Sequence, residues 1–141
     1  MATQRRRMLD LLVYVVLVFL LSMVPRSPDD AIEALIPGPK FFFRDKLAHI
    51  ISFVILGMLL FRALRWNVSP WRWATFGFLF ATAATIGALN ELFQAFVPGR
   101  EVGLGDWAAD LFGAAIGIGI FTFTAWGVRG GTSADRIAKG S

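Results

Sequence analysis

The sequence predicts an all-α fold, an integral membrane four-helix bundle with both termini in the cytoplasm. Hydrophobic residues make up 56% of the 141 residues, a larger share than soluble domains of this length carry. Four apolar runs approach the roughly 20 residues of helix that cross the hydrocarbon core of a bilayer. The basic residues lie between these runs and form no single stripe, which argues against a nucleic-acid partner despite the net charge of +4.

The whole chain, residues 1–141, is predicted to form a single transmembrane domain with helices at residues 8–24, 47–64, 73–97 and 107–128. Pro25 and Pro98 follow the first and third apolar runs and end them, because proline cannot continue the hydrogen bonding of a helix. Residues 25–46 are expected to form an extracytoplasmic loop, and residues 129–141 a cytoplasmic tail.

The first apolar run also has features of a signal peptide, since three arginines precede a short apolar core. The small-residue cleavage site expected after such a core is missing, and the segment VPRSPDD follows instead. A retained first helix is therefore the favoured interpretation.

The orientation is predicted from the lysine and arginine residues of the short loops, which favour the cytoplasmic side. Nine basic residues fall on the side that carries both termini: Arg5, Arg6, Arg7, Arg62, Arg65, Arg72, Arg129, Arg136 and Lys139. The five on the other side are offset by eight acidic residues of that side. Four tryptophans lie near the proposed inner interface, where amphipathic rings prefer to lie: Trp66, Trp71, Trp73 and Trp126. Both termini are therefore expected in the cytoplasm.

Polar residues gather at the predicted outer ends of the second, third and fourth spans. Asp45 and His49 are four residues apart and share one face of a helix, with Lys46 one turn from His49. Glu91 and Gln94 lie within an apolar run that continues past them, which places them at membrane depth. The sequence thus predicts that charged side chains from several helices meet near one face of the membrane.

The fourth span carries acids and small residues on one stripe. Asp106, Asp110, Gly113 and Gly117 follow one another at helical spacing, and the glycines form a GxxxG pair that allows close helix packing. Asp110 is therefore expected to point into the bundle. A carboxylate at such a depth costs roughly 2.5 to 3.5 kcal/mol on insertion scales, so a partner or a function is expected for it.

The candidate ligand-binding cluster consists of Asp45, Lys46, His49, Glu91, Gln94, Arg100, Asp106 and Asp110. Its four acids outnumber Lys46 and Arg100 by two, so either one carboxyl is protonated or the cluster accepts a cation or a ligand's ammonium group. Simpler interpretations exist, since Lys46 and Arg100 can extend to lipid headgroups and Asp106 can cap a helix. No recognised metal-ligand spacing or nucleophile motif is present, and we predict no metal or cofactor and assign no catalytic residue.

Two segments, DKLAHIISFVILGMLL and NELFQAFVPGREVGLGDWAADLFGAAIG, resemble the VanZ-like family of small bacterial membrane proteins. The family pattern corresponds here to Asp45, Lys46, His49, Glu91, Gln94, Gly99, Arg100 and Asp106. Where the family often has asparagine, this chain has Asp110, which adds a deep charge. The resemblance implies a location in the bacterial cytoplasmic membrane and a role in the cell envelope. Because the family is named for a glycopeptide-resistance accessory, it also suggests a link to teicoplanin resistance, with no settled chemistry.

Three functions remain open at the level of the sequence. In the first, the cluster lies in the extracytoplasmic leaflet and binds an amphiphile, either a lipid-linked cell-wall precursor or a lipoglycopeptide such as teicoplanin. In the second, His49 and the carboxylates perform acid/base or metal-assisted chemistry on an envelope lipid. In the third, the charges form a closed network of salt bridges that only holds the helices together. Membrane lipids are the expected partners in all three, and the sequence does not predict the oligomeric state.

Overall fold

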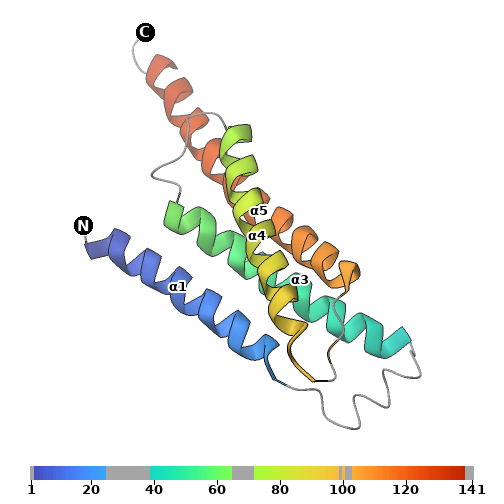
Figure 1. Ribbon diagram of the computed structural model, residues 1–141. Helices are drawn as coiled ribbons and strands as arrows, with labels where there is room; N and C mark the ends of the chain where they lie inside the picture. Colours follow the sequence, from blue (N-terminus) through green and yellow to red (C-terminus); the bar gives the residue numbers. More distant parts are fainter. Residues whose placement is uncertain (1, 25–38, 65–71, 99, 101–102, 139–141) are drawn as a thin grey trace.

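The computed structural model describes residues 2–24, 39–64, 72–98, 100 and 103–138. The described residues form four helices and no strand (Figure 1): α1 (Ala2–Ser22), α3 (Pro39–Leu64), α4 (Arg72–Gln94) and α5 (Leu104–Ala138). The predicted all-α fold is confirmed. Side chains can be discussed for residues 2–24, 46–64, 73–98, 100 and 103–122.

Three helices contain segments that are long and apolar enough to cross a membrane: Lys46–Leu64, Trp73–Gln94 and Leu104–Thr122. The helix α1 is not among them, because its 21 residues include three arginines and Asp10. A fourth membrane span therefore stays a prediction, as does the orientation of the termini.

The helices are longer than their apolar runs. The segment predicted as a loop over residues 25–46 is helical from Pro39, and α5 continues to Ala138 through most of the predicted tail. At the other end, α1 already begins at Ala2, before the arginines. The physical reason is that helix formation requires only backbone hydrogen bonding, so a helix can extend past the part that suits lipid. Hydropathy predicts the apolar part of a helix that suits lipid, but it does not predict where the helix begins and ends.

The third predicted helix is slightly shorter than expected, since α4 ends at Gln94 and not at residue 97. Beyond this point the backbone tightens, because the amide of Val97 donates to the carbonyl of Gln94 at 2.9 Å. Pro98 follows, and it disfavours helical conformation at the residue before it. The turn brings the chain back toward the start of α5.

The closest helix contact is between α3 and α5, which run parallel (Figure 1). A Cβ atom on Gly113 would clash with the carbonyl of Ile50, and one on Gly117 with the carbonyl of Val54. Gly113 and Gly117 are four residues apart, and so are Ile50 and Val54, so the two helices are parallel with this register. Gly113 and Gly117 are the two glycines of the GxxxG pair, and their lack of side chains lets the two backbones touch.

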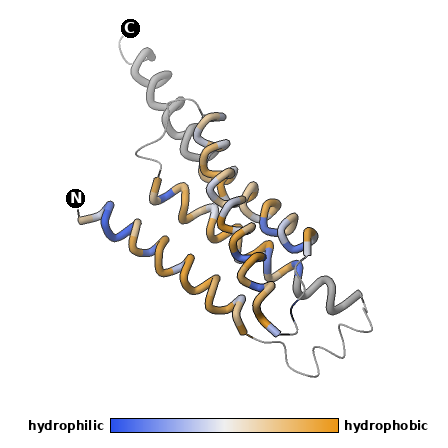
Figure 2. The backbone as a smooth tube through the Cα atoms, in the orientation of Figure 1, coloured by the Kyte–Doolittle hydropathy of each residue, from blue (hydrophilic) through white to orange (hydrophobic). Residues whose placement is uncertain are grey.

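The remaining helices pack on this pair. On α1, Tyr14 donates a hydrogen bond of 3.0 Å to the carbonyl of Ser52 on α3. Phe19 meets Phe93 of α4 edge to face, with ring centroids 5.3 Å apart. The outer surface keeps many exposed apolar side chains, and hydrophobic residues cover much of the described helices in Figure 2. This distribution suits a lipid environment, in which apolar side chains need not be buried in protein.

Candidate functional site

The centre of the site is a contact between an imidazole and a carboxylate. His49 Nδ1 on α3 lies 2.8 Å from Asp110 Oδ1 on α5. His49 is 8% exposed and Asp110 is fully buried. The glycine contact explains the approach, because Gly113, three residues after Asp110, touches the backbone of Ile50, next to His49.

A second charged pair lies one turn earlier on the same two helices. Lys46 Nζ forms a salt bridge with Asp106 Oδ1, and both side chains are largely buried. Since α3 and α5 are parallel, Lys46 precedes His49 as Asp106 precedes Asp110, and the two pairs lie in successive turns. The predicted stripe on α5 therefore meets a matching stripe on α3.

The third helix contributes Glu91, which is 4% exposed. Its Oε2 accepts a hydrogen bond of 3.2 Å from the backbone amide of Gly103, just before α5. The approach of α4 to α5 is close at Gly87, where a Cβ would lie 3.3 Å from Asp110 Oδ2. As a result, His49, Glu91 and Asp110 each offer one ligand atom within 4.8 Å of the others.

Further polar residues surround this centre from α4 and the turn after it. Arg100 Nη1 donates a long hydrogen bond of 3.5 Å to Gln94 Oε1, and Gln94 is 2% exposed. Asn90, next to Glu91, is 1% exposed. The predicted cluster did not include Asn90, although a polar amide inside an apolar run is a recognisable signal for membrane depth.

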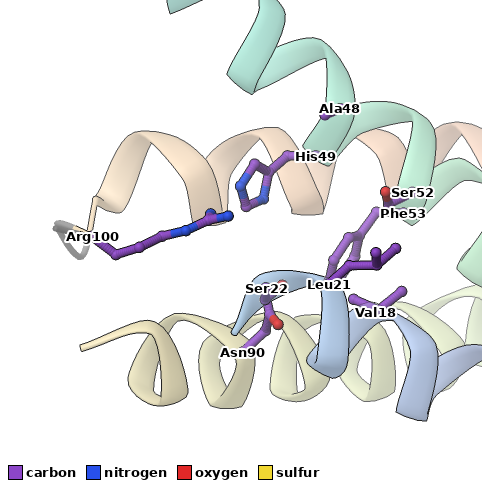
Figure 3. A pocket seen from close by; sticks show the side chains of 9 residues that line it. All are labelled: Val18, Leu21, Ser22, Ala48, His49, Ser52, Phe53, Asn90 and Arg100. Atoms are coloured by element: carbon purple, nitrogen blue, oxygen red, sulfur yellow. The ribbon is translucent and has the colours of Figure 1, made fainter. Parts of the chain in front are cut away.

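A cavity of about 190 Å³ borders the cluster, between α1, α3 and α4. It is lined by Val18, Leu21, Ser22, Ala48, His49, Ser52, Phe53, Asn90 and Arg100. Figure 3 shows His49 and Arg100 approaching each other at one end, whereas Val18, Leu21 and Phe53 gather at the other. The cavity therefore has a polar end and an apolar end. Its α1 residues were not predicted, because nothing in the sequence of an apolar helix tells which face meets a site.

Several buried polar atoms of the cluster have no hydrogen-bond partner among the residues that the structure describes. They are Asn90 Oδ1, Glu91 Oε1, Gln94 Nε2, Arg100 Nε and Asp110 Oδ2. Buried polar groups without partners are uncommon in folded proteins, and each calls for an explanation. These atoms mark the site as one with unused hydrogen-bonding or ligating capacity.

The structure brings together seven of the eight predicted cluster residues: Lys46, His49, Glu91, Gln94, Arg100, Asp106 and Asp110. The side chain of Asp45 lies outside the described residues.

The family comparison agrees with the resemblance seen in the sequence. A family model described as VanZ/LLP1 matches residues 8–125 of the 141 residues. Comparisons with curated proteins and with solved structures gave no match. The matched range includes every residue of the site and most residues of each of the four helices. The chain therefore belongs to the VanZ/LLP1 family.

Proposed function

We propose that this protein binds the polar part of an amphiphilic cell-envelope molecule in the cavity beside His49. The observation that carries the proposal is the cavity's two-sided lining. His49, Asn90 and Arg100 form a polar end, and the side chains of Val18 and Leu21 help form an apolar end. An amphiphile has the same two-part character, and few other ligands would use both ends at membrane depth.

The size of the cavity limits what enters it. At about 190 Å³ it is smaller than the pockets that enclose whole drug-sized ligands. It accommodates a headgroup fragment or a short length of chain, while the rest of the molecule extends into lipid or water. Such partial enclosure suits a lipid-linked cell-wall precursor or the acyl chain of a lipoglycopeptide.

The charges at the site suit a ligand that carries both signs. Arg100 offers guanidinium donors to a phosphate or carboxylate. Glu91 and Asp110 do not line the cavity, but they lie next to His49 and add negative charge that attracts an ammonium group. A lipid-linked precursor, with phosphates next to an amino sugar and a peptide, has both kinds of group. Teicoplanin, with amino groups and an acyl tail, is a second ligand of this type.

The unpartnered atoms also favour binding over a closed network of salt bridges. A network that served packing alone would gain most from full satisfaction of its polar groups, because half-satisfied buried networks are costly. Glu91 Oε1, Gln94 Nε2 and Arg100 Nε have no hydrogen-bond partner in the described part of the chain. With the predicted orientation, the site lies in the extracytoplasmic leaflet, where precursors are used and glycopeptides arrive.

Photocrosslinking in lipid nanodiscs tests the proposal. The probe is a polyprenyl-pyrophosphate disaccharide-pentapeptide with a diazirine near the pyrophosphate, added to wild type and to two matched tryptophan variants. Ala48→Trp places an indole in the cavity wall, whereas Ala81→Trp places one on an exposed face of α4 outside it. We expect labelling to fall at least fivefold in Ala48→Trp and to stay at the wild-type level in Ala81→Trp. Equal labelling of both variants would contradict the proposal.

A second candidate function is acid/base catalysis on the same class of lipid. It is favoured by the contact of 2.8 Å between His49 and Asp110, since a carboxylate that orients an imidazole is a common arrangement for proton transfer. His49 also lines the cavity, so a bound headgroup would lie beside it. Release of phosphate from a polyprenyl pyrophosphate distinguishes the two functions. Catalysis requires release above background by wild type that is lost in His49→Ala, whereas pure binding gives none in either.

A further inference from the structure

We propose that His49, Glu91 and Asp110 form a binding site for a divalent transition-metal ion of the Zn²⁺ or Mn²⁺ type. The three residues come from three different helices, α3, α4 and α5, and the sequence alone predicted no metal site because they have no recognised ligand spacing. The proposal concerns a different ligand from the amphiphile, and it assigns the unpartnered oxygens of Glu91 and Asp110 to the ion while Arg100 and Asn90 stay available to the amphiphile.

The geometry of the three side chains fits a metal. One ligand atom from each lies within 4.8 Å of the other two. Nitrogen and oxygen ligands bind Zn²⁺ at about 2.0 to 2.2 Å, so ligand atoms around one ion lie roughly 3 to 4 Å apart. Small side-chain adjustments would close the difference. All three residues are buried, with exposed fractions of 8% or less, so the ion would be shielded from bulk solvent.

A second observation is independent of this clustering. Glu91 Oε1 and Asp110 Oδ2 are buried and have no hydrogen-bond partner in the described part of the chain. A buried carboxylate oxygen without a partner is expensive, and a metal ion supplies the missing interaction. Two carboxylates also provide two negative charges, which a divalent ion neutralises while neutral histidine binds through nitrogen. The acids of the cluster outnumber its bases by two, and a bound cation is one of the ways in which this excess of negative charge can be neutralised.

The surrounding contacts are of the kind that orient metal ligands. The amide of Gly103 holds Glu91 through Oε2 and leaves Oε1 available. The parallel packing of α3 and α5 holds His49 against Asp110, and the Lys46–Asp106 salt bridge supports the next turn. Hydrogen bonds and packing that fix the ligands commonly account for 10- to 100-fold of metal affinity.

The ligand types indicate which ions the site prefers. One imidazole and two carboxylates suit Zn²⁺, Mn²⁺ or Fe²⁺, whereas Ca²⁺ and Mg²⁺ prefer oxygen ligands only. Three protein ligands leave at least one position for water or for a ligand oxygen. Because His49 also lines the cavity, that position would lie near the bound headgroup of the proposed amphiphile.

The chain contains a single histidine and no cysteine, which makes a direct test possible without any mutation. Protein purified with a histidine-free tag is stripped with chelator, reloaded with Zn²⁺, Mn²⁺, Ca²⁺ or Mg²⁺, and dialysed. We expect about one Zn²⁺ or Mn²⁺ retained per chain and no Ca²⁺ or Mg²⁺. X-ray absorption of the Zn²⁺ form, or pulsed electron paramagnetic resonance of the Mn²⁺ form, is expected to show one imidazole, which can only be His49. Retention below 0.1 ion per chain, or a bound ion without imidazole, would overturn the proposal.

Isosteric variants then assign the carboxylates. Glu91→Gln and Asp110→Asn keep the side-chain shape and remove the charge, and each is expected to weaken Zn²⁺ binding more than about 100-fold, because direct ligands count for more than their supports. Asp10→Asn is the matched control, since Asp10 is an exposed acid on α1 that pairs with Arg62 in the last turn of α3. Equal affinity in all three variants would contradict the assignment. Amphiphile labelling is measured separately, so the failure of one proposal leaves the other testable.

Discussion

His49 and Asp110 lie 2.8 Å apart although 61 residues separate them in the sequence, and both are buried in the contact between two parallel helices. The carboxyl group of Asp110 gives the imidazole a hydrogen-bonding partner where both side chains are largely hidden from solvent. Removal of one member of a buried pair leaves the other without compensation, which commonly costs about 3 to 5 kcal/mol.

Asp110→Ala is therefore expected to lower the free energy of unfolding by about 3 to 5 kcal/mol. Asp10→Ala is the control, because Asp10 and its partner Arg62 are both more than 40% exposed and exposed pairs contribute about 0.2 to 1 kcal/mol. The measurement is unfolding of the detergent-solubilised protein by sodium dodecyl sulfate, followed by circular dichroism. Similar losses in the two variants would show that burial of the His49 contact does not matter to stability.

The glycines of α5 provide a sharper contrast. In Gly117→Ala the added methyl group would meet the backbone of Val54, which cannot move without shifting α3. We expect a loss of about 1 to 3 kcal/mol in the free energy of unfolding, as for overpacked cores. Gly119→Ala, two residues away, meets no atom within 4 Å and should be neutral or slightly stabilising, because alanine favours helix. If both changes had the same effect, close contact at Gly117 would not hold the helices together.

The salt bridge between Lys46 and Asp106 should couple more strongly than the exposed bridge between Asp10 and Arg62. The side chains of Lys46 and Asp106 are 20% and 11% exposed, against 42% for Asp10 and 47% for Arg62. Double-mutant cycles with alanine at each position measure the coupling directly. We expect more than about 1 kcal/mol for the first pair and less for the second. The reverse order would mean that the buried pair is weakened by its loss of hydration.

The orientation of the termini can be tested because the chain has no native cysteine. Single cysteines at Ser27, in the predicted extracytoplasmic loop, and at Ser141, at the predicted cytoplasmic end, are treated with a membrane-impermeant maleimide in intact cells. We expect labelling of Ser27→Cys alone, with Ser141→Cys labelled only after lysis. The opposite pattern would place the site in the cytoplasmic leaflet and remove the proposed access of precursors.

The composition of the site was largely predictable because helical spacing places residues on faces. Asp106, Asp110, Gly113 and Gly117 share a stripe whatever lies opposite them, and the cost of a carboxylate in lipid requires that this stripe face the bundle. The apolar run around Glu91 predicted a position at membrane depth for this residue, and the structure shows it 4% exposed. The apolar spans were predictable for a similar reason, since bilayer thickness fixes their length.

Only the tertiary structure decided which side chains meet. The sequence gives no means of telling whether His49 faces Asp106 or Asp110, because that choice depends on how far one helix is displaced along the other. The contact of Gly113 with Ile50 sets this displacement. The cavity likewise depends on where α1 lies, and the stretch of α1 from Leu11 to Leu21 carries no charged residue that would predict its rotation. Spacing along one helix is fixed by the covalent chain, whereas the alignment between helices results from the packing of all of them.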